Sequence, residues 1–322
     1  MRGRRQFFTG AVVAAGVFFV AAALPLPLYL IAPGSAIDLS SAVTVGSIAA
    51  PRDRFFLTDV HVMRASPLRL AFALFPGVIL TSADKVLPHG VSGARFDDVM
   101  QTAMTQSQSV AAVVAERAAG LSVALPPAEV QVEAIDAASA ARGVLAVGDV
   151  IRTVDRRAVH GLDDVRAAVS IKRSGAPVWL AIDRAGRQRI VPIRTILLGG
   201  QRRLGVLLGE RYGPARLAIP VRYTIGDVGG SSGGLMIALR IYDSLRSRAA
   251  GRVRSFAGTG TIALDGRIGP IEGTQQKLIA AKRAGASIFF VPRANYADIA
   301  GERDVRVIPV ETFRQALRAL DG

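Results

Sequence analysis

A pair of serines set among glycines is the feature of this sequence with the clearest capacity for chemistry. Ser231 and Ser232 stand in GDVGGSSGGLMIALRIYD, which begins at Gly226 and runs directly into an apolar helical pattern. Glycines allow close backbone approach and unusual dihedral angles, and the N–H groups at a helix start have no partner within the helix. The stretch is therefore either a loose turn before a helix or a tight elbow that presents a nucleophile, with N–H groups that can hold an oxyanion.

A phosphate-binding loop is a competing interpretation of the same glycines. That loop requires a Lys directly after its last Gly, in the form G-x-x-x-x-G-K-[ST]. Here Gly234 is followed by Leu235, and the chain contains no Gly-Lys dipeptide. The motif therefore argues against phosphate binding.

The base for such a serine would have to be a lysine. A serine nucleophile needs a neighbouring base, and beyond residue 204 the chain has no His and only two lysines, Lys277 and Lys282. On a helix, Ala280, Ala281 and Ala284 share the face of Lys277, so this amine projects from a small apolar stripe. Burial lowers a lysine pKa from its usual value of about 10.4, whereas Arg stays protonated. The pattern equally fits a Lys whose stem covers apolar surface while its head reaches water.

The composition excludes several other kinds of site. The chain has no Cys, which excludes disulfides, thiolate metal sites and a Cys nucleophile. Its three His are far apart and lack metal-ligand spacing, so we expect no metal and no cofactor. The formal net charge of +15 first suggests nucleic acid. The arginines are spread along the whole chain without interleaved aromatic residues, so we expect no nucleic-acid partner.

The N-terminus has the composition of a membrane segment. Three arginines among the first five residues precede an uncharged run from Gln6 to Ile37, with an apolar core at Phe7–Ile31. About 20 apolar residues span a bilayer, whereas a cleavable signal has a shorter apolar region of about 7–15 residues. We predict an uncleaved transmembrane helix in residues 1–33, with a cytoplasmic N-terminus and the bulk of the chain outside the membrane. Ala32-Pro-Gly-Ser-Ala36 leaves cleavage open as an alternative.

The remaining chain divides into three predicted regions, which makes the expected fold class α+β multidomain. Residues 34–118 have a mixed α/β pattern, including a long helix over Phe96–Gly120 that ends at a Gly and contains no obvious chemistry. Residues 119–200 contain strands, a short helix and a hairpin that turns at Arg184–Gly186. Residues 201–322 alternate strands and helices, as in an α/β or α+β domain.

Residues 119–200 resemble a PDZ domain in the order of their elements and in the stretch GVLAVGDVIRTVDRRAV. PDZ domains bind extended peptides, often chain ends, by adding a strand to a sheet edge. The resemblance implies a peptide-binding unit, with Gly120–Val123 as the candidate carboxylate-binding loop. A PDZ-like fold that only packs against its neighbours is the alternative.

Two later stretches, GGSSGGLMIAL and GTGTIALDGRIGPIEGTQQKLIAAKRAGASIFFVP, resemble the proteolytic domain of Lon proteases, a family with a Ser–Lys dyad. The family's Pro-Ser-Ala-Gly motif falls on Ser231–Gly234, which implies that Ser232 is the nucleophile. Its Gly-Gly-x-x-x-Lys motif falls on Glu272–Lys277, which implies that Lys277 is the base. Its Thr-Gly pair falls on Thr259 and the next residue, which implies that Thr259 hydrogen-bonds and orients the lysine.

Several residues depart from the family pattern around the intact pair. Gly230, Ser231 and Gly233 are the predicted supporting residues of the elbow, with Ser231 in place of the motif's Pro and Gly233 in place of its Ala. Gly229 stands where many Lon proteins have Asp, and Glu272 stands in place of the first Gly. We expect the extra glycines to loosen the elbow, and the Glu272 carboxylate to raise the lysine pKa and weaken the base. Activity is still expected because both dyad residues are present.

The order of the regions resembles bacterial membrane-anchored PDZ domain-containing Lon-like proteases. The N-terminal stretches APGSAIDLSSAVTVG, FFLTDVHVM and MTQSQSVA carry the same resemblance. It implies an ATP-independent serine endopeptidase that cleaves unfolded or exported polypeptides outside the membrane. It also implies a homo-oligomer, since Lon-type domains usually form rings of six. Two alternatives stay open: a PDZ-bearing adaptor that captures exported polypeptides without cleaving them, and an Arg-rich tether for anionic lipid or nucleic acid.

Overall fold

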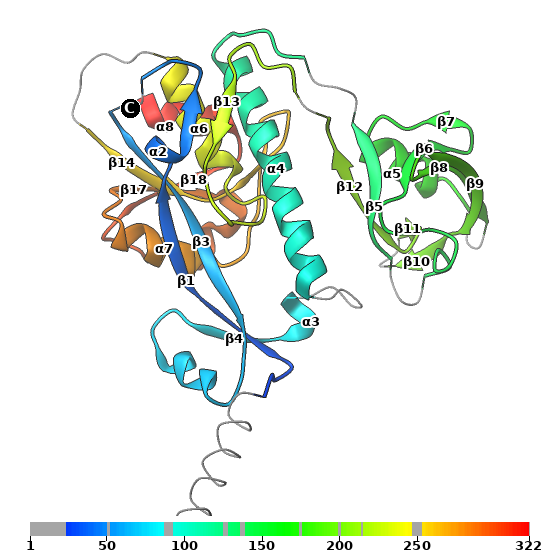
Figure 1. The fold of residues 1–322 in the computed structure, drawn as a ribbon, viewed down its shortest axis with the longest axis horizontal. Helices are drawn as coiled ribbons and strands as arrows, with labels where there is room; N and C mark the ends of the chain where they lie inside the picture. Colours follow the sequence, from blue (N-terminus) through cyan, green and yellow to red (C-terminus); the bar gives the residue numbers. More distant parts are fainter. Residues whose placement is uncertain are drawn as a thin grey trace, which may run out of the picture. The chain divides into compact units, whose positions relative to one another are not determined.

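The structure of the chain is a computed structural model (Figure 1). It describes residues 24–49, 52–86, 93–124, 128–135, 139–173, 176–198, 201–213, 215–246 and 253–321. The chain forms two compact units. Unit 1 combines three stretches of sequence, Met1–Leu87, Gly93–Leu121 and Ile219–Gly322, whereas unit 2 holds Ser122–Ala218. Each unit is described by itself.

Unit 1 is a mixed α/β unit that takes elements from both ends of the chain. Its elements before unit 2 are β1 Leu28–Asp38, α2 Leu39–Ala42, β2 Val43–Val45, β3 Arg54–Arg64, the 3-10 helix η1 Arg69–Leu74, β4 Ile79–Ser82, α3 Ala83–Val86 and α4 Gly93–Ala118. Its elements after unit 2 are β13 Val221–Tyr223, α6 Gly234–Leu245, β14 Ser255–Gly258, β15 Thr261–Ile262, β16 Ile268–Gly269, α7 Thr274–Arg283, β17 Ile288–Pro292, the 3-10 helix η2 Arg293–Ile299, β18 Arg306–Val310 and α8 Phe313–Asp321.

One six-stranded sheet holds unit 1 together, in the order β18-β17-β14-β3-β1-β4. The pairs from β18 to β3 are parallel, and β1 is antiparallel to both β3 and β4. The junction between β14 and β3 pairs Phe256 with Phe55, two residues that are far apart in the sequence. The N-terminal strands are therefore part of the same sheet as the C-terminal strands.

The two faces of this sheet bury different side chains, as alternation along a strand requires. Phe56, Ala257 and Phe289 pack with Leu278 and Ala281 of α7 on one face. The rings of Phe55, Phe256 and Phe290 stack in series, with centroid separations of 5.3 and 5.9 Å. Helix α6 contacts β3 and β14 and also packs along α4, and all but the last of its residues are buried.

The sheet changes the predicted division of the chain. The predicted region 34–118 does not stand apart from region 201–322, because β3 is hydrogen-bonded to β14. The predicted boundary at residue 200 also moves, because β12, Val206–Arg211, pairs with β5 of unit 2. Sequence patterns mark strands but carry no information about their pairing partners, which explains both differences.

The predicted membrane span falls largely on residues 1–23, which lie outside the described residues. Within the described part of the chain, no helix combines the length and the apolar character needed to cross a membrane. The last four residues of the predicted apolar core, Leu28–Ile31, belong to strand β1, and Leu30 is fully buried. The predicted helix therefore cannot extend to Ile31, because this stretch pairs with β3 and β4.

Unit 2 is built on a second sheet, of order β12-β5-β6-β8-β9, with β7 paired to β6. Its elements are β5 Glu129–Ile135, β6 Val150–Val154, β7 Arg157–Ala158, α5 Leu162–Ser170, β8 Pro177–Arg184, β9 Arg187–Arg194, β10 Ile196–Leu198, β11 Gln201–Arg203 and β12 Val206–Arg211. Val165, Ala168 and Val169 of α5 are buried against the sheet, as the apolar face of that helix predicts. The predicted hairpin joins β8 to β9, and Ala185 and Gly186 in its turn both have positive φ.

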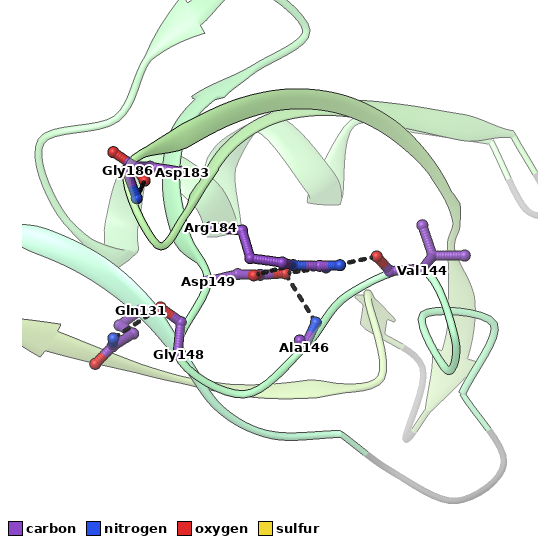
Figure 2. A network of polar contacts seen from close by, with 8 residues as sticks. All are labelled: Gln131, Val144, Ala146, Gly148, Asp149, Asp183, Arg184 and Gly186. Atoms are coloured by element: carbon purple, nitrogen blue, oxygen red, sulfur yellow. Dashed lines mark hydrogen bonds and ion pairs between the residues drawn. The ribbon is translucent and has the colours of Figure 1, made fainter.

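An ion pair fixes the loop before β6 in unit 2 (Figure 2). The side chain of Asp149 is fully buried and accepts two hydrogen bonds of 2.7 Å from Arg184. Arg184 also donates to the carbonyl of Val144 at 2.8 Å, and the N–H of Ala146 donates to Asp149 at 2.8 Å. Burial alone would raise the pKa of Asp149, but the bonds from Arg184 and Ala146 outweigh it and hold the pKa below its usual value.

Candidate active site

The predicted elbow at Ser232 is tightly held by helix α4. Ser232 lies in the turn before α6, whose first helical residue is Gly234. The N–H of Gly230 donates to the carbonyl of Met100 at 2.7 Å, and Ser107 Oγ donates to the carbonyl of Ser231 at 2.9 Å. The sequence pattern of α4 suggested no chemistry, yet this helix supplies the groups that hold the elbow.

The glycines allow this close packing instead of loosening the elbow. Gly230 has φ +92°, in the left-handed region that favours glycine. A Cβ on Gly234 would lie 2.6 Å from Ser107 Oγ and 2.8 Å from Ile262 Cγ2, closer than real contacts allow. A Cβ on Gly233 would likewise overlap the side chain of Leu57. The expectation of a looser elbow is therefore wrong at these positions.

Helix α7 brings the side chain of Lys277 into contact with Ser232. It lies in the first turn of α7, and its side chain is buried together with Ala280 and Ala281. Its Nζ donates a hydrogen bond of 2.7 Å to Ser232 Oγ. Of the two interpretations left open by the sequence, the buried amine is the one observed, since Lys277 is only 4% exposed. Lys282 instead lies on the surface, in an ion pair with Glu302 and Asp304.

Thr259 connects the two sides of the pair. It follows β14, is fully buried, and its Oγ1 accepts a hydrogen bond of 3.3 Å from Lys277 Nζ. The same Oγ1 donates to the carbonyl of Ser232 at 3.2 Å, and the N–H of Gly260 donates to that carbonyl at 2.7 Å. The structure thus brings together the three residues that the sequence analysis selected, at the end of a buried parallel strand.

Burial controls the proton affinity of the lysine. It lowers the pKa of Lys277 from 10.5 to about 8, against the opposing effect of the Asp59 and Glu272 carboxylates, which raise it. The contribution of Glu272 has the predicted sign. Asp59 was not predicted, because nothing in its sequence position on β3 relates it to α7. Only the packing of α7 against β1 and β3 brings it near.

Possible metal-ligating side chains do not cluster in the part of the chain that the structure describes. Within the ranges given above, no group of three or more His, Cys, Asp or Glu side chains is placed to hold a metal ion. The polar groups that meet at this site are the half-buried hydroxyl of Ser232, the buried amine of Lys277 and the buried hydroxyl of Thr259. This set suits proton transfer and nucleophilic attack.

Unit 2 carries a separate groove of about 730 Å³ between α5 and β12. Val165 and Val169 line one side, and Leu204, Val206 and Leu208 line the other. Strand β12 is at the end of its sheet, so its outer edge faces this groove without a strand partner among the described residues. The groove has the form that an extended peptide could enter.

The predicted carboxylate-binding loop, Gly120–Val123, contributes no residue to the lining of this groove. Gly120 has φ +84° and donates its N–H to the carbonyl of Arg117, and the N–H of Leu121 donates to the carbonyl of Glu116. Both residues thus end helix α4 of unit 1. The groove is lined instead by the segment from Arg202 to Leu208, which the sequence analysis had assigned to the following domain.

The part of the chain that contains Ser232, Thr259 and Lys277 is similar to known proteins. Residues 221–319 match the Lon protease (S16) C-terminal proteolytic domain. The Lon protease of Mycolicibacterium smegmatis is 45% identical over 73 residues, Lon protease 1 of Myxococcus xanthus 36% over 94, and Lon protease 2 of Herpetosiphon aurantiacus 32% over 123. Ser232, Thr259 and Lys277 all lie inside the matched region.

These relatives are much longer than the part they share with this chain. The three alignments cover 22%, 28% and 36% of this chain but only 9%, 11% and 14% of the relatives. Among solved structures, the PDZ domains of the SdrC-like proteins from Listeria monocytogenes and Listeria innocua are 21% and 20% identical. They cover 24% and 25% of this chain and 85% and 92% of their own, each with a TM-score of 0.24. That score is too low to establish a common fold.

Proposed function

We propose that unit 1 is a serine endopeptidase in which Ser232 is the nucleophile and Lys277 is the general base. The observation that carries this proposal is the 2.7 Å hydrogen bond between a buried amine and a serine hydroxyl. Similarity to Lon proteolytic domains over residues 221–319 supports the same reaction class.

The proposed reaction begins with the neutral amine of Lys277, which takes the proton of Ser232 Oγ as that oxygen attacks the scissile carbonyl. A pKa of about 8 leaves roughly a tenth of the lysine neutral at pH 7. The backbone N–H groups of Ser232 and Gly233 donate to no other group in the described structure, so they are free to bind the oxyanion. Lys277 then passes its proton to the leaving amine as the C–N bond breaks.

The second half of the reaction releases the acyl-enzyme. Lys277, neutral again, takes a proton from a water molecule that attacks the ester carbon, and the Ser232 oxygen recovers a proton as it leaves. Thr259 holds the amine on the serine side through its 3.3 Å hydrogen bond. The same amine therefore serves as base and acid in turn, which requires a pKa near the working pH.

The proposed substrates are unfolded or exported polypeptides outside the membrane, cleaved without ATP by a homo-oligomer tethered through its N-terminal helix. The chain includes no phosphate-binding motif of the kind that couples hydrolysis to unfolding. Folded substrates should accordingly resist cleavage, and addition of ATP should leave the cleavage rate unchanged.

The test compares turnover of an unfolded protein such as casein by the wild type and by matched variants. We expect Ser232→Ala and Lys277→Arg each to lower kcat/KM by at least about 1,000-fold. Ser109→Ala on α4 and Lys282→Arg on α7 are the controls and should retain wild-type turnover. Equal rates for Ser232→Ala and Ser109→Ala would refute the dyad.

A second proposed function is the capture of polypeptide chain ends by unit 2. The groove between α5 and β12 supports it, together with Arg202, which lines the groove and has a buried Nη1 without a hydrogen-bond partner among the described residues. A free C-terminal carboxylate would satisfy this nitrogen. If peptide binding persists while a serine-reactive acylating probe fails to label Ser232, the chain is an adaptor and not a peptidase.

A further inference from the structure

An exposed apolar surface lies at the far end of the β1–β3 pair in unit 1, and neither the dyad nor the groove uses it. We name it the 68–80 patch; its members on and beside η1 are Leu68, Phe72, Leu74 and Phe75, each between 48% and 88% exposed. Ile79 and Leu80 of β4, 44% and 43% exposed, extend it on the two faces of that strand. Five of the six residues of η1 are apolar, yet none of the six is buried. Soluble surfaces rarely leave so many large apolar side chains together in water.

The patch is a defined structure and not a frayed loop. Leu70 N–H bonds to the carbonyl of Ser66, and Phe75 N–H bonds to the carbonyl of Phe72. The rings of Phe72 and Phe75 lie 6.0 Å apart. At the other end, Gln276 Nε2 on α7 donates to the carbonyl of Gly77 at 2.9 Å. The fold thus holds these side chains out in a fixed arrangement.

The start of the described chain lies at the base of this patch. The N–H of Leu26 donates to the carbonyl of Ala65, the N–H of Ala65 donates to the carbonyl of Leu28, and the N–H of Ala83 donates to the carbonyl of Pro27. Figure 1 shows the first described residues, in blue, and the cyan segment between β3 and β4 at the same end of the β1–β3 pair. The uncharged apolar run that begins at Phe7 therefore joins unit 1 beside the patch.

The charged residues within the stretch Val60–Ala83, which contains the patch, have one sign. Between Val60 and Ala83 the sequence contains Arg64 and Arg69 but no Asp or Glu. Both guanidinium groups donate to backbone carbonyls, Arg64 to Leu26 and Arg69 to Arg64. Apolar and aromatic tips with arginines at their base are the composition of surfaces that enter the headgroup region of an anionic bilayer.

We infer that the 68–80 patch docks onto the lipid bilayer, with Leu74 and Phe75 inserted among the headgroups and upper acyl chains. The inference uses the predicted N-terminal span to place the bilayer and does not depend on the peptidase proposal. An unfolded polypeptide and a second copy of this chain are the other possible occupants, and the experiment below separates them from lipid.

Because the sequence contains no Cys, a single introduced Cys is the only thiol that a fluorophore can label. Full-length Leu74→Cys carries an environment-sensitive fluorophore and is reconstituted into phosphatidylcholine–phosphatidylglycerol vesicles that contain acyl-chain spin labels. Ile171→Cys, at a 70% exposed position in unit 2, carries the same label as the control. We expect spin-labelled lipid to quench the Leu74 label at least three-fold more than the Ile171 label, and aqueous iodide to show the reverse order.

Equal lipid quenching at the two positions would overturn the inference. A blue shift of the Leu74 label in detergent on adding unfolded casein would identify polypeptide as the occupant, and a shift that grows with protein concentration would identify a second copy; both overturn it. As a second variant, the label at Leu68→Cys should lose at least half of its lipid quenching when Leu74 and Phe75 are both replaced by Ser. All measurements are repeated with Ser232→Ala, so a failed dyad leaves the outcome readable.

Discussion

The two candidate sites of this molecule are built in opposite ways. In unit 1 Lys277 and Thr259 are buried and Ser232 is half-buried, and the hydrogen bond from Lys277 to Ser232 depends on α7, β14 and the elbow before α6. In unit 2 the groove is open, and it is lined by α5, by the β10–β11 pair and by β12 at the edge of the larger sheet. The site in unit 1 needs segments from before and after unit 2 in the sequence, whereas every residue that lines the groove comes from residues 162–208.

The difference shows where each site is sensitive to change. The elbow in unit 1 has no room for added atoms, since a Cβ on its glycines would overlap Leu57, Ser107 or Ile262. Some residues that line the groove in unit 2 are exposed, such as Leu207 at 55%, so their truncation should weaken binding without disturbing the fold. Changes in stability, packing, charge and pH should therefore separate the two kinds of site.

Asp149→Ala should destabilise unit 2 by about 3 kcal/mol and leave turnover by unit 1 unchanged. The change leaves Arg184 without its buried partner, which is the costly way to break an ion pair. Denaturant unfolding checks the value, with Asp163→Ala in an exposed pair as a control that should cost about 0.5 kcal/mol or less.

The pH dependence sharpens that test. Because the pKa of Asp149 is lowered in the fold, its stabilisation is complete above the unfolded-state pKa of about 3.9 and is lost as pH falls through the folded-state pKa. The difference between wild type and Asp149→Ala should therefore shrink in acid. A difference that is constant from pH 7 to pH 3 would contradict the assigned role of the ion pair.

Gly234→Ala should destabilise unit 1 by about 2 kcal/mol and lower peptidase turnover, because the new Cβ displaces Ser107 and Ile262. Unit 2 should keep its peptide affinity. Gly301→Ala, where the added Cβ meets nothing within 4 Å, is the matched control and should change stability by less than about 0.5 kcal/mol. Wild-type stability and turnover in Gly234→Ala would show that the elbow is not tightly packed.

Arg202→Ala should weaken binding of a peptide with a free C-terminal carboxylate by about 10-fold, since a charge-assisted hydrogen bond is lost. The same peptide with an amidated end should bind both proteins alike. Arg187→Ala, at an exposed position on β9 that does not line the groove, is the control. Fluorescence anisotropy measures the affinities, and identical losses for the two peptides would rule out carboxylate recognition by Arg202.

Glu272→Gln should move the pH profile of kcat/KM to lower pH by about 0.3 units. The base must be neutral to act, so activity should rise with pH through the lysine pKa of about 8. Glu272 raises that pKa, and its removal therefore lowers it. Glu302→Gln, which alters the ion pair of Lys282, should leave the profile in place. A shift to higher pH would reverse the assigned sign.

Prediction from sequence was most successful where the local pattern itself carries the chemistry. Lys277 was placed on a small apolar helix face, and the structure buries it with Ala280 and Ala281. The helix α4 was predicted within a few residues because its helical pattern and its terminal Gly are local properties. Leu28–Ile31 was misassigned because a buried strand and the end of an apolar helix have the same composition.

Long-range placement could not be predicted in the same way. Asp59 on β3 influences Lys277 only because α7 packs on β1 and β3. Met100 and Ser107 hold the elbow from a helix that lies more than a hundred residues earlier in the sequence. The groove segment after Arg202 was assigned to the wrong region because the pairing of β12 with β5 leaves no local signal.

By itself, the sequence determined the choice of Ser232, Thr259 and Lys277 as candidate site residues and the sign of the influence of Glu272, because residue type and local periodicity depend only on neighbours along the chain. The tertiary structure decided that the two ends of the chain share one sheet, that α4 closes the elbow and that the Lys277 amine lies 2.7 Å from Ser232 Oγ. Those facts depend on strand pairing and on side-chain packing between distant segments, which a linear pattern does not encode.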